Sequence, residues 1–145
     1  MNWKKEAVDR LKKYALMHKS LSNIPKEIKR LETEACSIRS ARTDATPLRG
    51  GGNRREEAML NNLVRRQNLQ WSLEQAKLWV KATADALSVL PAEEKLILQR
   101  CFLYPEKGGV EQLCRELGVE QSSIYRKRDT ALLNFTLALY GAVES

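Results

Sequence analysis

The stretch "VEQLCRELGVEQSSIYRKRDTALLNF", residues 110–135, decides the fold of the C-terminal half of the chain. Apolar residues recur at helical spacing over residues 110–117 and again after residue 121, and Gly118 lies between the two segments. Glycine suits a sharp turn at this point because it adopts a positive φ at little steric cost. Apolar or small side chains occupy the positions where two helices joined by such a turn would pack, namely Leu113, Cys114, Leu117, Val119 and Ile124. The stretch therefore predicts a helix-turn-helix whose second helix covers about residues 121–135.

The second helix of this motif begins with polar and basic side chains that we expect to face outward. Glutamine can pair with both edges of adenine and arginine with those of guanine, and serine and tyrosine hydroxyls can reach base edges in a major groove. The residues predicted to read bases are Gln121, Ser122, Tyr125 and Arg126. The alternative is a solvated helix in an ordinary bundle, and the residues of the turn favour the DNA-reading interpretation.

Three further residues of the same helix suit the phosphates of a DNA backbone. They are Ser123, Lys127 and Arg128. Hydroxyl and cationic groups account for most phosphate contacts, and the free N–H groups at the start of a helix favour the same anion. Lys127 also stands where a helix-turn-helix commonly has an apolar residue, so its aliphatic stem is expected to cover the core while its amine stays outside.

The rest of the chain also shows helical patterning, with no sustained alternation typical of strands, so an all-α fold is predicted. Residues 2–20 form one amphipathic block, and Pro25 is expected to begin a new helix because proline suits the first turn. Two heptad-like seams follow, which predicts a long helical hairpin resembling a coiled coil. The first seam is Leu21, Ile24, Ile28, Leu31, Ala35 and Ile38, and the second is Met59, Leu63, Gln70, Leu73, Ala76, Val80, Thr83 (or Ala84) and Leu87.

Proline and glycine positions divide the chain into two predicted domains. Pro47 and three consecutive glycines indicate a hinge loop over about residues 40–54, between the two seams. Residues 1–90 are interpreted as a helical hairpin, an arm for oligomerisation or polymerase contact, and residues 91–145 as the helix-turn-helix domain. The seams alone leave open whether the hairpin closes within one chain or between chains.

Charge is distributed unevenly along the chain. The whole chain has a formal net charge of +7, which favours an anionic partner such as nucleic acid. Residues 1–90 hold 18 Lys and Arg against 10 Asp and Glu, whereas residues 91–145 hold 7 against 8. Outside the reading helix the strongest basic cluster is Arg54, Arg55, Arg65 and Arg66. That cluster is interpreted as a solvated face, with backbone contacts to DNA as the second option.

Cysteine and histidine usage gives no sign of a metal site. Cys36, Cys101 and Cys114 lack the paired spacing of zinc ligands, and His18 is the single histidine. No catalytic constellation or cofactor motif was found, so we expect neither an enzyme nor a cofactor. The charged N-terminus is unlike a secretory signal and no stretch is apolar enough to span a bilayer. The cytoplasm, that of a bacterial host if the protein is phage-encoded, is therefore the expected location, without membrane association.

The segment "ALSVLPAEEKLILQRCFLYPEKGGVEQLCRELGVEQSSIYRKRDTALLNFTLALYG", residues 86–141, resembles the C-terminal half of phage transcriptional regulators of the RinA/ArpU type. These proteins look like region 4 of bacterial sigma factors, which reads the upstream promoter element. The resemblance implies a regulator, such as an activator of late or packaging genes, that binds double-stranded DNA and contacts host RNA polymerase. It also implies that Gln121, Ser122, Ser123, Tyr125, Arg126 and Arg128 belong to the recognition helix. Nothing in the chain resembles the promoter-opening region 2 of sigma factors.

Two other functional classes fit part of the pattern. A small terminase subunit, which takes part in DNA packaging, also joins a helix-turn-helix to a helical oligomerisation hairpin, although its reading module usually comes first. A polymerase-binding adaptor without DNA contact is the third interpretation. A homo-oligomer, with a dimer favoured, is expected because one small DNA-binding unit rarely supplies enough contact for tight binding.

Overall fold

The computed structural model describes residues 2–44 and 51–142, and these residues form helices and their connecting turns, with no strand. The prediction of an all-α fold is therefore confirmed. Along the chain the elements are α1 (Trp3–Asp44), α2 (Gly51–Ser88), α3 (Ala92–Leu98), the π-helical turn η1 (Gln99–Leu103), α4 (Gly109–Leu117) and α5 (Gln121–Tyr140). Within these described residues, no helix is long and apolar enough to cross a membrane.

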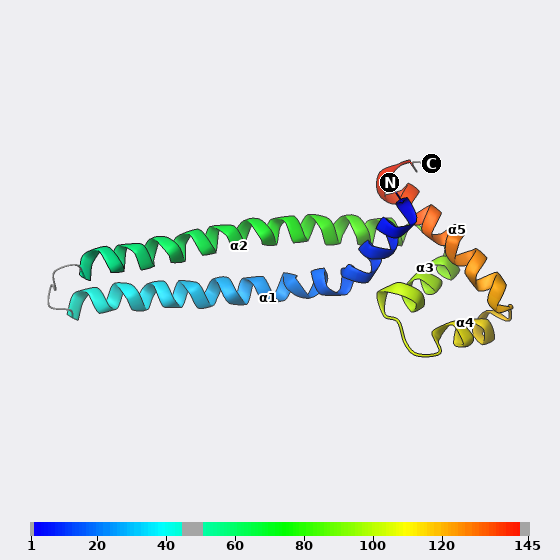
Figure 1. The fold of residues 1–145 in the computed structure, drawn as a ribbon, viewed down its shortest axis with the longest axis horizontal. Coiled ribbons are helices and arrows are strands. Elements are labelled where there is room, and N and C mark those ends of the chain that lie inside the picture. The colour runs from blue at the N-terminus through cyan, green and yellow to red at the C-terminus, as the bar shows by residue number, and fades with distance from the viewer. Residues whose placement is uncertain (1, 45–50, 143–145) are drawn as a thin grey trace. The chain divides into compact units, whose positions relative to one another are not determined.

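The chain forms two compact units, and both long helices contribute to each of them (Figure 1). The first unit joins residues 1–18 to residues 78–145, and the second consists of residues 19–77. Sequence patterning placed the boundary at residue 90 instead. The difference arises because the first turns of α1 and the last turns of α2 pack into the same core as α5.

The unit formed by residues 19–77 is an antiparallel helical hairpin (Figure 1). Its seam buries Leu31 and Ala35 of α1 together with Leu73 and Ala76 of α2, the heptad positions expected of coiled-coil packing. The predicted hairpin is thus present within a single chain.

Two seam positions of α2 differ from the sequence prediction. Gln70 is exposed, and the neighbouring Leu69 is half-buried in its place. Leu63 is exposed, and the neighbouring Asn62 is buried in its place. The Asn62 amide donates to the Leu31 carbonyl at 2.8 Å, and Arg66 Nε donates to Asn62 Oδ1 at 2.7 Å. A buried amide is tolerated when its donors and acceptors are paired, so these two bonds explain why asparagine faces α1.

Pro25 does not begin a helix as predicted, because α1 runs through it without interruption. Proline inside a helix removes one N–H bond and costs on the order of 3 kcal/mol. Burial of Leu31 and Ala35 further along the same helix favours continuing it through this position. Both ends of the predicted hinge over residues 40–54 are helical instead, because α1 extends to Asp44 and α2 begins at Gly51. Residues 45–50, including Pro47, lie outside the described residues.

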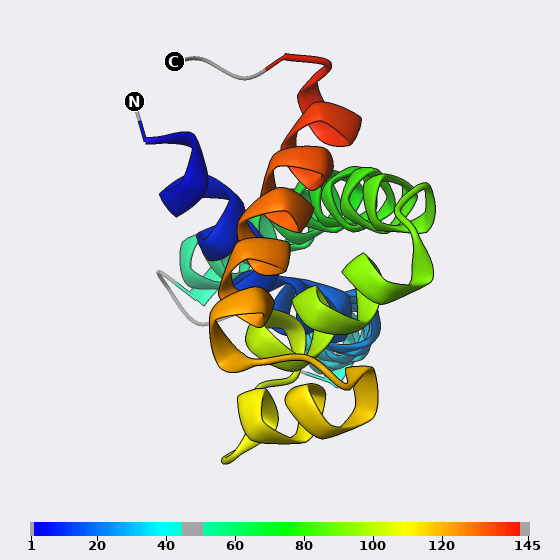
Figure 2. The ribbon, with the colours of Figure 1, turned by 90° about the vertical axis from the view of Figure 1, so that its right-hand side faces the viewer.

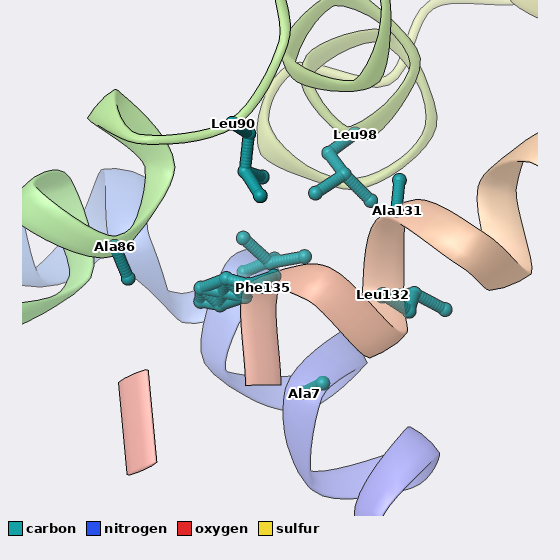
Figure 3. Packing of buried hydrophobic residues seen from close by; sticks show 8 residues of the cluster. Ala7, Ala86, Leu90, Leu98, Ala131, Leu132 and Phe135 are labelled. Atoms are coloured by element: carbon teal, nitrogen blue, oxygen red, sulfur yellow. The ribbon is translucent and has the colours of Figure 1, made fainter. Parts of the chain in front are cut away.

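The other unit is built around Phe135 of α5, which is fully buried (Figure 3). Leu132 and Ala131 of α5, Leu98 of α3, and Leu90 after α2 complete the centre of this core. Ala7 and Leu11 of α1 and Ala86 of α2 close it from the other side. Since α5 supplies three core residues, this part of the helix is anchored in the unit.

Helix α5 extends beyond the predicted residue 135, as far as Tyr140. Gly141 ends it with a φ of 77°, a left-handed conformation typical of helix ends. Upstream, Glu93 and Glu94 occupy the first turn of α3. Carboxylates there are favoured by the helix dipole.

Candidate nucleic-acid interface

A turn at Gly118 joins α4 to α5 and fixes the start of the candidate reading helix (Figure 2). Gly118 has a φ of 66° and a ψ of 34°, the left-handed conformation that the sequence predicted for a glycine. The Gly118 N–H donates to the Cys114 carbonyl, and the Val119 N–H reaches the same oxygen at 3.2 Å. These bonds satisfy the end of α4 and redirect the chain into α5.

A small apolar core holds the two helices of the motif in place. Leu113 of α4, Ile124 of α5 and Ile97 of α3 are fully buried in it. Cys114, Leu117 and Val119 pack around them, so the five residues predicted to support the turn share one cluster. Because Ile124 faces inward, the residues on the opposite side of the first turns of α5 face solvent.

The backbone at the start of α5 presents unpaired donors. Glu120 occupies the N-cap position in an extended conformation and makes no side-chain capping bond. No acidic residue stands in the first turn. The first N–H groups of a helix lack partners within it and, together with the helix dipole, favour an anion. This end of α5 can therefore accept a phosphate.

The four residues predicted to read bases all lie on the exposed side of α5. Gln121, Ser122, Tyr125 and Arg126 are exposed. Gln121 Nε2 donates to the Tyr125 hydroxyl at 2.8 Å. Arg126 Nη2 lies 3.4 Å from Ser123 Oγ, so both long side chains have a local partner that limits their freedom while their tips stay accessible.

The three residues predicted to contact phosphates are engaged more closely with the protein. Lys127 Nζ lies 2.7 Å from Glu93 Oε1, and this ion pair joins α5 to α3. The Arg128 guanidinium stacks over the Tyr125 ring at 4.9 Å. Ser123 is half-buried beside Arg126. The ion pair accounts for a lysine at a position where an apolar residue is usual.

Arg100 is a basic residue of this region that sequence reasoning missed. It donates to Glu116 of α4 at 3.1 Å. It also lines a hollow of about 380 Å³, shared with Gln121, Tyr125 and Arg128 of α5 and with Glu106 and Glu111. Its position within the apolar run "LILQRCFL" gave no signal that it would lie beside the reading helix.

The second basic cluster belongs to the other compact unit. Arg54 is exposed, Arg65 lies 3.8 Å from Glu27, and Arg66 holds the buried Asn62. Arg55 is half-buried. Arg54 and Arg65 are therefore the members of this cluster best placed to bind an external anion, whereas Arg66 is bonded to the buried Asn62.

No group of three or more metal-ligating side chains occurs within residues 2–44 and 51–142. Burial raises the pKa of the Cys101 thiol, and the positive charge of Arg128 opposes this increase. A thiol that holds its proton in this way is a poor nucleophile.

Comparisons of the chain with models of protein families, with curated proteins and with solved structures found no match.

Proposed function

We propose that the protein is a sequence-specific DNA-binding transcription regulator that reads a major groove with the first turns of α5. One observation carries the proposal. Gln121 and Arg126 are exposed on a helix that a left-handed glycine turns away from α4 and that Ile124 anchors from behind. A protruding helix of this kind fits a groove about 12 Å wide.

The bond between Gln121 and Tyr125 supports base reading rather than opposing it. A glutamine amide has two N–H donors and one oxygen acceptor. The 2.8 Å bond to the Tyr125 hydroxyl uses one donor. The second donor and Oε1 remain for the N7 and N6 positions of adenine, and the bond fixes the orientation of the amide before DNA arrives.

Arg126 is the principal candidate for guanine recognition. Its neighbour Lys127 is engaged with Glu93 at 2.7 Å, and Asp129 is engaged with Lys4 at 3.5 Å. Arg126 has only a weak contact with Ser123, at 3.4 Å. Breaking that contact costs little, so the guanidinium can form two bonds to O6 and N7 of guanine.

The proposal includes a phage setting and a contact with host RNA polymerase, on the strength of the resemblance to regulators of the RinA/ArpU type. Activation of late or packaging genes is the corresponding role. Arg54 and Arg65 would add contacts to phosphates, which strengthen binding without choosing a sequence.

The proposal can be tested with a duplex selected by the wild-type protein from a pool of random double-stranded oligonucleotides. Fluorescence anisotropy then measures affinity for this duplex and for a scrambled one. Arg126→Ala should weaken binding to the selected duplex by about 1–3 kcal/mol, or roughly 5- to 150-fold, and leave the scrambled duplex little affected. Arg54→Ala should weaken both equally. Arg39→Ala, which removes an exposed arginine of α1, is the matched control.

Two outcomes would contradict the proposal and indicate another class. If Arg54→Ala altered the sequence preference and Arg126→Ala did not, α5 would not be the reading helix. If no duplex bound even at low salt, where phosphate contacts are strongest, a polymerase-binding adaptor would be the better account. A ring of many copies in solution would instead favour a DNA-packaging role.

A further inference from the structure

The outer face of α2 in the hairpin unit carries large apolar side chains that none of the residues 2–44 and 51–142 covers. Leu60 is 59% exposed, Val64 44% and Trp71 66%. At 100° per residue these three lie within about 40° of one another around the helix. Leu63, 41% exposed, borders them. We refer to Leu60, Leu63, Val64 and Trp71 as the outer stripe.

The outer stripe is distinct from the seam that packs against α1. The seam residues Asn62, Leu73 and Ala76 are buried and lie on the opposite side of α2. Over residues 19–40, helix α1 carries no equivalent stripe, because its Leu and Ile side chains are buried or half-buried and its outer face is mainly polar. The outer residues of α1 include Lys26, Lys29, Arg30, Thr33, Glu34 and Ser37.

We propose that the outer stripe binds the same stripe of a second copy of this chain, with the two α2 helices antiparallel about a two-fold axis near Gln67. A two-fold interface requires a surface that complements itself. In this register Val64 of one copy lies opposite Trp71 of the other, so a small and a large side chain meet on each side of the axis. Apolar surface in a continuous stripe marks such an interface more strongly than scattered exposed residues do.

Charges beside the stripe favour the antiparallel arrangement over a parallel one. Glu56 and Lys77 flank the stripe on the same side of α2, near opposite ends of it. An antiparallel partner brings each Glu56 toward Lys77 of the other copy. A parallel two-fold partner would place the two copies of Glu56 on opposite sides of the interface at the same height, so neither would meet a Lys77. Lys77 Nζ also lies 3.6 Å from Glu74 Oε1 of its own chain, and this ion pair would be kept in the dimer.

Gln67 gives the arrangement a defined register. It lies in the middle of the stripe, between Val64 and Trp71, and is exposed. A single polar residue within an apolar helical seam disfavours shifted alignments that would leave it unpaired. Near the two-fold axis, the two Gln67 amides can bond to one another because each provides donors and an acceptor.

This inference does not depend on DNA binding, so its test omits DNA. Sedimentation equilibrium of the full-length protein should show a dimer. Trp71→Glu should raise the dimer dissociation constant at least tenfold while the circular dichroism of the helices stays unchanged. Leu16→Glu, at a leucine of α1 that is 72% exposed, is the matched control and should leave the dimer intact. A monomeric wild-type protein, or equal effects of the two variants, would overturn the inference.

Disulfide crosslinking tests the register independently. In a Cys36→Ser background, Gln67→Cys should form a crosslinked dimer under mild oxidation, and the background alone should not. Leu60→Cys should not crosslink, because the two copies of residue 60 would be about 15 residues apart along the helix axis, or about 22 Å. That separation exceeds the reach of a disulfide. Crosslinking at both positions would indicate a parallel pair, and crosslinking at neither would refute the interface.

Discussion

Replacing Gly118 with alanine isolates the conformational requirement of the turn that presents α5. The position has a φ of 66°, and a Cβ atom added there would meet no atom within 4 Å. The substitution therefore creates no steric clash with other residues, and any loss of stability must come from the backbone itself.

The size of the loss follows from two opposing terms. A residue with a Cβ in the left-handed region costs about 1–2 kcal/mol. Restricting the unfolded chain returns about 0.4–1 kcal/mol. Gly118→Ala should therefore lower the free energy of unfolding by about 1 kcal/mol. Gly118→Asn should cost less, because asparagine tolerates this conformation better than alanine does.

Urea unfolding followed by circular dichroism measures the effect, and Gly109→Ala provides the matched control. Gly109 is the first residue of α4, but its φ is not positive, and an added Cβ would be 3.5 Å from the Arg100 carbonyl oxygen, an ordinary contact. Its replacement should leave stability unchanged or slightly increased. A Gly118→Ala variant as stable as the wild type, or Gly109→Ala as damaging as Gly118→Ala, would refute the account of the turn.

Three further expectations concern the unit that contains α5. Ile124→Ala should lower the free energy of unfolding by about 2–5 kcal/mol, because removing a fully buried aliphatic side chain leaves a cavity. A loss below about 1 kcal/mol in urea unfolding would mean that Ile124 does not anchor the helix. A double-mutant cycle between Glu93 and Lys127 should give a coupling free energy of at most about 1 kcal/mol, because the ion pair is partly exposed. Added salt should reduce this coupling free energy, and a value that salt leaves unchanged would contradict the expectation. Alkylation of Cys101, followed in a Cys36→Ser, Cys114→Ser variant, should show a pH midpoint above the ordinary value of 9.0 because burial raises the pKa of this thiol. The folded protein then holds the proton more tightly than the unfolded chain, so stability should fall as the pH rises above 9.0; a midpoint at or below that value would contradict the expectation.

Local patterning in the sequence was sufficient to predict the turn and its supporting core. Gly118 has a distinctive conformational role, and Leu113 and Ile124 stand at fixed distances from it, so short-range spacing determined their burial. The outward direction of Gln121 and Arg126 followed from the same helical period. The all-α fold could be predicted equally well, because heptad spacing extends over many residues.

Interactions between distant segments could not be predicted from the sequence in the same way. Asn62 replaced Leu63 in the hairpin seam because a carbonyl of α1 and the guanidinium of Arg66 satisfy its amide. The boundary between units moved because Ala7 and Leu11 pack with Phe135 across most of the chain. The Lys127 ion pair depended on where α3 places Glu93. Each of these depends on tertiary contacts, which periodicity in one segment does not encode.

The most direct measurement of the central claim is a selection of bound duplexes from a random double-stranded pool, performed in parallel with the wild-type protein, Arg126→Ala and Arg54→Ala. Sequencing of the bound fractions gives the base preference of each protein at every position. The account expects a defined preference for the wild type, a loss of preference at one or two adjacent positions for Arg126→Ala, and an unchanged preference for Arg54→Ala. A wild-type fraction without enrichment, or an Arg126→Ala preference identical to that of the wild type, would contradict it.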